Sequence, residues 1–185
     1  TPSHPKLLDF LAAELVKNKW SLKSIHRLLT QSAVYQQASF PTSTSSTIDP
    51  ENRLLSFFPR RPIDFESMRD SLLVASGELD RSMGGKPGAL LGASATPRRS
   101  LYGRIDRQFL PNTLRAFDFA NPELHSPQRH LTNVPQQALF FMNSPFVEAR
   151  AIAFAKRIAM GSTDERITKS FQIAFQRNPT ENELR

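Results

Sequence analysis

Apolar residues recur at helical spacing along most of the chain, and this pattern predicts an all-α protein. The clearest stripe runs over residues 65–79, with Asp64 placed to cap the helix. Arg69 and Asp70 fall on the opposite face and are expected to be solvated. Similar signals predict helices beginning near Pro5, Ser21, Asp49, Pro111, Pro135, Ser144 and Ser162. The expected fold is an irregular helical bundle of seven to nine helices, with Trp20 filling the corner between the first two.

The most apolar stretch, residues 131–159, is the predicted centre of the bundle. Pro135 opens a short helix whose residues 138–142 are apolar on every side, so burial on all sides is expected. Pro145 has no N–H, which ends that helix by Asn143 and allows a second one to begin, capped by Ser144. The second helix is amphipathic.

Two regions are expected to be largely irregular. Residues 39–48 are a Ser/Thr-rich stretch, expected to be a surface loop of a single domain spanning 1–185. Residues 84–130 form a long Gly- and Arg-rich irregular insert. Its glycine-rich part, 84–97, is long for a structureless loop, which favours mobility or function. No Lys-Ser/Thr follows the glycines, so the stretch does not match a phosphate-binding loop.

Composition narrows the chemistry. Cysteine is absent, which excludes disulfides, thiolate metal sites and thiol nucleophiles within these 185 residues. No apolar run approaches the length of a membrane span, about 18 residues. The net charge of +7 permits an anionic partner such as nucleic acid, an acidic polysaccharide or an anionic membrane.

Arginine far outnumbers lysine, and this bias has two interpretations. The guanidinium group suits both the bracing of loops against helix ends and the recognition of oxyanions. The sharper hypothesis is that five arginines converge on a groove near the glycine-rich loop and bind a carboxylate or sulfate group. These candidates are Arg61, Arg98, Arg99, Arg107 and Arg129.

Other site chemistries have weaker support. The four histidines, His4, His26, His125 and His130, form no HExxH motif, so neither a metal nor a cofactor is expected. No G-x-S-x-G elbow is present. Asp106 and Asp118 could act as an acid–base pair, but the neighbouring arginines predict that both are salt-bridged.

Nucleic-acid binding is also disfavoured. A helix over residues 21–38 carries Lys23, Arg27 and several glutamines, as a recognition helix would. These side chains are spread around the helix instead of sharing one outer face, which argues against nucleic acid as a partner.

The ends of the chain suggest a piece of a longer protein. Thr180 and Glu183 fit a capping box that begins a helix only five residues before Arg185. A helix of about one turn is unstable alone, so we expect the chain to continue in its parent protein. The first residues show no charged region followed by an apolar core, so no signal peptide is expected in this segment.

Several segments resemble one family over nearly the whole chain. They are SHPKLLDFLAAELVKNKWSLKSIHRLLTQSAVYQQAS, RRPIDFESMRDSLLVASGELDRSMGG, RRSLY, AFDFANPE, QRHLTNVPQQALFFMNSPFV and RNPTENEL, in this order. The chain is similar to the uncharacterised C-terminal domain of large planctomycete proteins, which is often joined to a second uncharacterised domain and a cytochrome-c-like domain. Many relatives have a cysteine before the QRH-like motif, where this chain has His125-Ser126-Pro127, so the resemblance carries no thiol-dependent role.

The resemblance implies an exported protein with its haem module upstream, and hence a periplasmic or cell-surface setting. It implies no activity, and this chain has no CxxCH for attaching haem. The leading functional expectation is a non-catalytic structural or protein-interaction module whose partners are other domains of the parent chain. The alternative is a binding or catalytic domain for an anionic, polysaccharide-like substrate held by the arginine cluster; whether the chain is an enzyme stays open.

Overall fold

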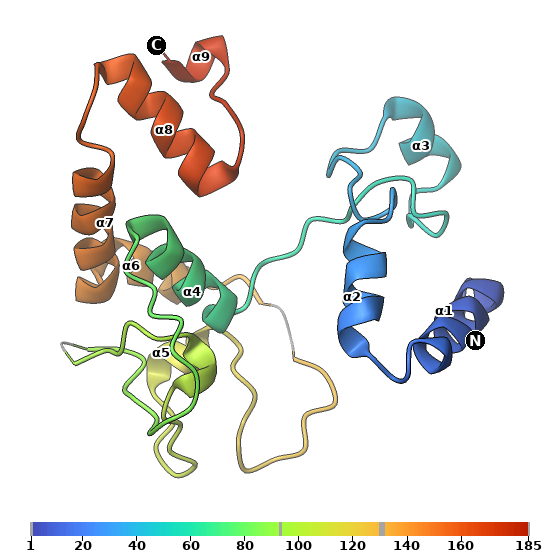
Figure 1. Ribbon diagram of the computed structural model, residues 1–185, viewed down its shortest axis with the longest axis horizontal. Helices are drawn as coiled ribbons and strands as arrows, with labels where there is room; N and C mark the ends of the chain where they lie inside the picture. Colours follow the sequence, from blue (N-terminus) through green and yellow to red (C-terminus); the bar gives the residue numbers. More distant parts are fainter. Residues whose placement is uncertain (1, 93, 130–131, 185) are drawn as a thin grey trace. The chain divides into compact units, whose positions relative to one another are not determined.

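The computed structural model describes residues 2–92, 94–129 and 132–184, and within these residues it is helical with no β-strand (Figure 1). The predicted all-α class is confirmed. The helices are α1 Pro5–Lys17, α2 Leu22–Thr30, α3 Ser43–Ile48, α4 Phe65–Ser76, α5 Asn112–Ala116, α6 Pro135–Asn143, α7 Pro145–Arg157, α8 Thr163–Phe175 and α9 Glu181–Leu184, with a 3-10 turn, η1, at Ser100–Tyr102.

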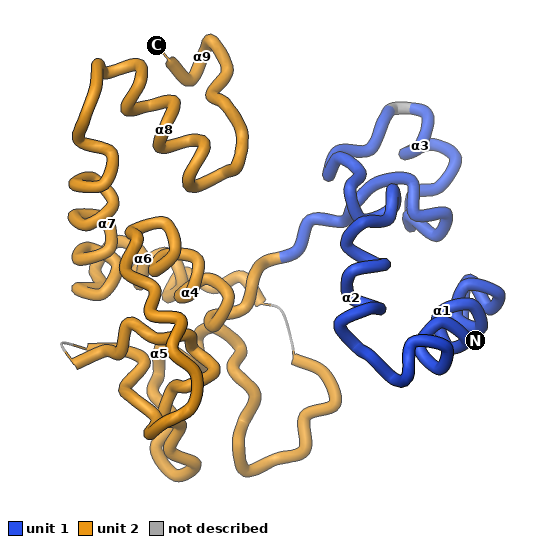
Figure 2. Tube along the Cα trace, viewed as in Figure 1, with its two compact units in different colours: residues 1–61 blue, residues 62–185 orange. Residues whose placement is uncertain are grey.

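The chain divides into two compact units, Thr1–Arg61 and Pro62–Arg185 (Figure 2). The division is finer than the single domain expected from the sequence. None of the helices in the described residues combines the length and the apolar character that crossing a bilayer requires.

In unit 1, α1 and α2 begin where the caps predict, but α2 ends at Thr30, short of the predicted residue 38. Asn18 ends α1, and the hydroxyl of Ser21 accepts a hydrogen bond from the Ser24 backbone N–H at 3.4 Å. Trp20 was expected to plug the corner, but its side chain is 70% exposed. Lys19 and Trp20 both adopt left-handed backbone conformations, which reverse the chain at this point and leave the indole outside.

The expected Ser/Thr-rich loop at 39–48 is wrong in part, because residues 43–48 form α3. The hydroxyl of Thr42 caps this helix by accepting from the Ser45 backbone N–H at 3.1 Å. Hydroxyl side chains favour such caps, so a Ser/Thr-rich stretch can begin a short helix as readily as it forms a loop.

The helix predicted to start at Asp49 is also absent, and two side chains explain why. Asp49, the one buried residue among those described in unit 1, accepts hydrogen bonds from the backbone N–H groups of Arg53 and Leu54 at 2.9 and 2.6 Å. Asn52 bonds Ser56 and Phe57 in the same way. These local bonds compete with the helical ladder and hold the segment in turns.

Unit 2 is built around α4. Asp64 caps the helix through the Ser67 backbone N–H at 2.7 Å, and Gly77 ends it in a left-handed conformation. Phe65 and Met68 from α4 form the buried core with Leu90, Leu110 and Leu114. The other face of α4 packs against α7, and η1 lies against α4 as well.

The predicted centre, α6, is not the buried one. Its bounds match the expectation, since it runs from Pro135 to Asn143 and α7 begins at Pro145, but none of its residues is buried. Phe140 packs against Phe117 and Phe65, with ring centroids 5.4 and 6.2 Å apart. Leu139 and Phe141 are about half exposed, so α6 is a peripheral helix with one anchored face. At the elbow, Ser144 has the extended backbone of a cap, but its hydroxyl makes no capping bond.

The C-terminal helices follow the sequence signals closely. Ser162 and Glu165 form the predicted capping box at the start of α8. At α9 the Glu183 carboxylate accepts from the backbone N–H of Thr180 at 2.8 Å and is bound by both terminal nitrogens of Arg177. The Arg177 guanidinium, followed by the Thr180 N–H, lowers the pKa of Glu183 to about 2.

Candidate functional site

Arg69 is the most deeply buried charged side chain in the described residues, with no exposed surface. The expectation that it points to solvent is therefore wrong. Its Nε donates to the Leu90 carbonyl at 2.8 Å and its Nη1 to the Arg98 carbonyl at 3.0 Å, and Nη2 donates to the Thr96 carbonyl. Burial lowers the pKa of Arg69, Asp70 opposes that shift, and the charge of Arg150 adds to it.

Asp70, the next residue, holds the start of η1. Its carboxylate accepts from the backbone N–H of Ser100 at 2.8 Å and from the Ser100 hydroxyl at 2.7 Å. Arg69 and Asp70 together therefore fix the segment that follows the glycine-rich loop. Neither is the solvated surface residue that the helical period predicted.

The glycine-rich region is folded around these anchors. The Gly88 N–H donates to the Tyr102 carbonyl at 3.0 Å, and the Thr96 N–H donates to the Ala89 carbonyl at 2.8 Å. Isolated parallel bridges join Asp80 to Arg98 and Gly88 to Gly103. Gly103 is required by close packing, because a Cβ there would lie 2.2 Å from the Cδ2 of Leu90.

Two of the five candidate arginines bind partners within unit 2. The Arg98 side chain donates to the carbonyls of Ser82, Gly84 and Lys86 and stacks on Tyr102 at 4.0 Å. Arg129 forms a two-pronged ion pair with Glu66 at 2.7 and 2.9 Å, which raises the pKa of Arg129.

The other three candidates have exposed side chains. Arg61 lies at the end of unit 1, whereas Arg99 and Arg107 belong to unit 2. Arg99 lines surface depressions beside α4 and η1, and Arg107 lines none of those described. An anion-binding role for these side chains therefore stays a prediction.

Arginines on α7 also act as braces. Arg157 donates to the carbonyls of Val74 and Ala75 at 2.8 and 2.7 Å, which satisfies the open C-terminal end of α4. Arg150 pairs with Glu78 at 2.8 Å, just beyond the same end of α4. These contacts explain how α7 is held against α4.

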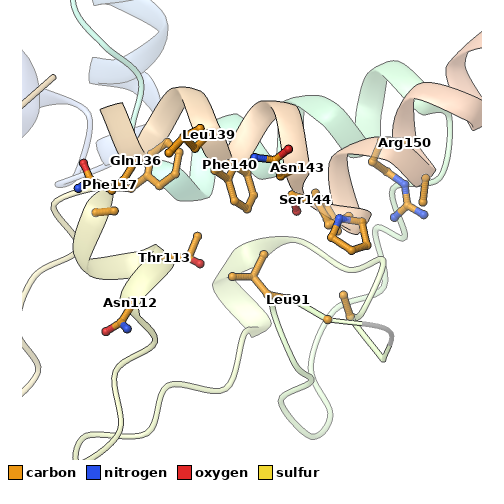
Figure 3. Close-up of a pocket in the computed structure, with 16 residues that line it drawn as sticks. Leu91, Asn112, Thr113, Phe117, Gln136, Leu139, Phe140, Asn143, Ser144 and Arg150 are labelled. Carbon is orange, nitrogen blue, oxygen red and sulfur yellow. The ribbon is translucent and has the colours of Figure 1, made fainter. Parts of the chain in front are cut away.

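An apolar groove of about 770 Å³ lies within unit 2 (Figure 3). Helix α6 and the start of α7 form one wall, with Leu139, Phe140 and Phe146. Asn112 and Thr113 of α5 face them, together with Leu91 from the glycine-rich region. The volume lies in the range of small-ligand sites, roughly 300–1,000 Å³.

The rim of this groove carries uncharged polar side chains. They are Asn112, Thr113, Gln136, Asn143 and Ser144. In the described part of the chain, no side-chain hydrogen bond is formed by any of them. Arg150 is the one charged residue in the lining, and no carboxylate contributes to it. The groove thus offers amide and hydroxyl groups beside an apolar floor and lacks an acid–base pair.

The remaining candidates for catalysis are not placed together. The carboxylate of Asp118 accepts from the backbone and hydroxyl of Thr132 at 2.7 to 3.0 Å, and Asp106 accepts from the Gln108 N–H at 2.9 Å. Neither forms an ion pair among the described residues, so the predicted salt bridges are wrong there. Within these residues no three His, Asp or Glu side chains gather in a way that could hold a metal ion, and His130 lies outside the described part.

Sequence reasoning missed the groove and Arg81. The amides and hydroxyls of the groove come from three separate segments and share no spacing that sets them apart. Arg81 is exposed and lines one surface depression together with Arg99. It follows an isolated bridge between two irregular segments, which has no sequence period to detect. Unit 2 is therefore an all-α domain in which arginine side chains hold the irregular segments and the end of α4 in place.

The chain belongs to the family described as "Protein of unknown function (DUF1553)", PSD1, whose match covers residues 1–185. Neither a curated protein nor a solved structure matches the chain.

Proposed function

We propose that this domain is a non-catalytic interaction module, and that the groove between α5, α6 and α7 receives an apolar segment from another domain of its own polypeptide. The observation that carries the proposal is that the arginines bind partners inside the domain, whereas the groove presents apolar and uncharged polar side chains. Buried or bracing arginines are bound to internal carbonyls and carboxylates, while the 770 Å³ groove is apolar and lined by no carboxylate.

The rim chemistry supports a polypeptide as the occupant. An amide side chain carries both donors and an acceptor, as a peptide backbone does. Gln136 and Asn143 stand on α6 on either side of Leu139 and Phe140 (Figure 3). A partner segment could therefore bury apolar side chains on the floor and pair its backbone with the rim, so that its polar groups are not left unsatisfied.

The exposed apolar side chains of α6 support the same role. Leu139 and Met142 are 52% and 78% exposed in this chain, and Phe141 is 45% exposed. Large apolar side chains gathered beside a groove are typical of surfaces that associate with another protein.

For the setting, we propose a large exported, cytochrome-linked polypeptide of the planctomycete type, at the periplasm or cell surface. The support is the resemblance of the quoted segments alone. Fractionation of cells that express the parent protein, followed by detection of this domain, tests the location.

The groove is tested with a matched pair of variants. Leu139→Arg places a charge on the groove wall, and Ile152→Arg places one on a half-exposed site of α7 outside the lining. Binding of the chain to the remaining domains of its polypeptide, measured by calorimetry, should fall at least tenfold for Leu139→Arg and change little for Ile152→Arg. Equal affinities for both variants would contradict the proposal.

Oxidative footprinting gives an independent reading of the same surface. Met142 lies on α6, whereas Met83 and Met160 are equally exposed elsewhere in unit 2. In the full polypeptide, oxidation of Met142 should slow while Met83 and Met160 stay reactive. Protection of Met83 or Met160 with no change at Met142 would place the interface on another face.

An anionic, polysaccharide-like ligand is the second candidate. Of the five arginines that suggested it, Arg98 and Arg129 are committed to internal partners, so the predicted cluster is reduced. The observation in its favour is that Arg99 and Arg107 remain exposed with no side-chain partner among the described residues.

A further inference from the structure

Two arginines that have no side-chain partner among the described residues lie on a surface of unit 2 distinct from the groove. The bridge between Asp80 and Arg98 is parallel, and the Asp80 N–H donates to the Pro97 carbonyl at 3.0 Å. Arg81 and Arg99 each follow one of these two bridged residues. Both line the same surface depression of about 410 Å³.

This arrangement is electrostatically unfavourable in the chain alone. Two like charges that line the same depression repel each other. Neither guanidinium forms an ion pair or a hydrogen bond within the described residues, and no carboxylate lines the depression. The neighbouring acidic groups are occupied. Asp70, which lines adjoining depressions with Arg99, bonds Ser100. Asp80 bonds the backbone and hydroxyl of Ser82, and Glu78 pairs with Arg150.

The rest of the depression is apolar, apart from the hydroxyl of Tyr102, which can donate one further hydrogen bond. Leu79, Met83 and Leu101 surround the two arginines, together with Tyr102. The Tyr102 ring is held by the Arg98 guanidinium, whose centre lies 4.0 Å from the ring centroid. Its hydroxyl forms no hydrogen bond among the described residues. Because Arg98 is fixed by loop carbonyls, the ring has a rigid backing.

We infer that Arg81 and Arg99 form an oxyanion-binding site for a sulfate or carboxylate group carried on a body with an apolar face. Each guanidinium can donate two parallel hydrogen bonds to such a group, and the anion would cancel the repulsion between the two cations. The apolar side chains around them would contact the body of the ligand. This site does not depend on the docking function proposed for the groove.

The probes are inorganic sulfate, 4-nitrophenyl sulfate and 4-nitrobenzoate, with 4-nitrophenol as the uncharged control, titrated against the chain at low ionic strength. We expect saturable binding of the aryl sulfate or the aryl carboxylate, tighter than inorganic sulfate because of the apolar contacts. A preference between the two aryl anions identifies which oxyanion the site takes. Equal binding of 4-nitrophenol would overturn the anion assignment.

Two double variants separate a site from general attraction to a chain of net charge +7. Arg81→Ala with Arg99→Ala should weaken binding of the preferred aryl anion at least tenfold. Arg104→Ala with Arg166→Ala removes the same charge from exposed arginines outside the depression and should weaken binding less than threefold. Similar losses in both double variants, or no loss in the first, would overturn the inference.

The melting temperature of the double variant is a control for correct folding that does not depend on binding. Since the side chains of Arg81 and Arg99 have no partners in the described chain, their double variant should keep the melting temperature of the parent or exceed it at low salt. A large fall in melting temperature would show that the two arginines are braces and would overturn the assignment. Replacing both by lysine keeps the charge but removes the fork, so intermediate affinity is expected.

Discussion

The Nε of Arg69 donates to the carbonyl oxygen of Leu90 at 2.8 Å, although the two residues are 21 positions apart and both are buried. The same guanidinium reaches the carbonyls of Thr96 and Arg98. The guanidinium thereby satisfies backbone carbonyls of an irregular segment, which in a sheet would be satisfied by a neighbouring strand. Helix α4 thus provides both the apolar core residues and the donor that orders the glycine-rich region.

Replacing Arg69 by methionine should strongly destabilise unit 2. The substitution keeps much of the side-chain volume but leaves the buried carbonyl of Leu90 and the partly buried carbonyls of Thr96 and Arg98 without their donor. Each buried group left unsatisfied costs about 1–3 kcal/mol. We expect a loss of roughly 3–5 kcal/mol in the free energy of unfolding, measured by urea denaturation. Arg166→Met, on an exposed site of α8, is the control and should change stability by less than about 0.5 kcal/mol. Equal midpoints for both variants would show that Arg69 contributes little.

The role of Arg69 shows where sequence periodicity loses its power. The helical spacing located α4 correctly through Asp64 and Gly77, because caps and breakers act locally. The same helical spacing predicted that Arg69 is exposed, because a charged residue outside an apolar stripe usually faces solvent. Its partners lie 21 to 31 residues away in a stretch with no period, so no local pattern could reveal them.

Burial of α6 was mispredicted for a related reason. Residues 138–142 are apolar on every side, but only Phe140 of that run lies against the core of unit 2. The composition of a helix gives the amount of its apolar surface, but it does not reveal which neighbouring element covers that surface. The groove is unpredictable for the same reason, because it is formed by three segments that only the fold brings together.

Gly103 is predicted to be intolerant of even one methyl group. An added Cβ would lie 2.2 Å from Cδ2 and 2.4 Å from Cγ of Leu90, so the leucine would have to leave its buried position. Gly103→Ala should cost about 1–3 kcal/mol of stability through overpacking. Gly84→Ala is not a matched control, because Gly84 has a positive φ. Restoring stability by combining Gly103→Ala with Leu90→Ala or Leu90→Val would identify the clash as the cause, and no rescue by either would contradict it.

The ion pair between Arg129 and Glu66 should contribute modestly, despite its two-pronged geometry. Both side chains keep about a quarter to a third of their surface exposed, so solvent screens their attraction. A double-mutant cycle of Glu66→Ala and Arg129→Ala should give a coupling free energy of about 0.5–1 kcal/mol. Part of the Arg129→Ala effect comes from its stacking on Phe119 at 4.8 Å, which the cycle removes from the coupling term. A coupling that does not fall at high salt would argue against a screened ion pair.

The stability of unit 2 should depend on pH through Asp64. The pKa of this carboxyl is lowered from 3.8, mainly by the Ser67 hydroxyl, with burial opposing and the Ser67 backbone N–H and the charge of Arg129 adding. Because the folded pKa lies below the unfolded one, the stabilisation is fully present above pH 3.8 and is lost as the pH falls through the lowered value.

Asparagine caps helices about as well as aspartate but does not titrate, so Asp64→Asn isolates this effect. At pH 7 the variant should lose less than about 1 kcal/mol. Between pH 5 and pH 2, the free energy of unfolding should fall less steeply for the variant than for the parent chain, as measured by urea denaturation at each pH. Other carboxyls with lowered pKa values, such as Glu183, titrate in both proteins and cancel in the difference. If the free energy of unfolding fell equally steeply with pH in both proteins, the cap would contribute equally whether or not Asp64 is charged.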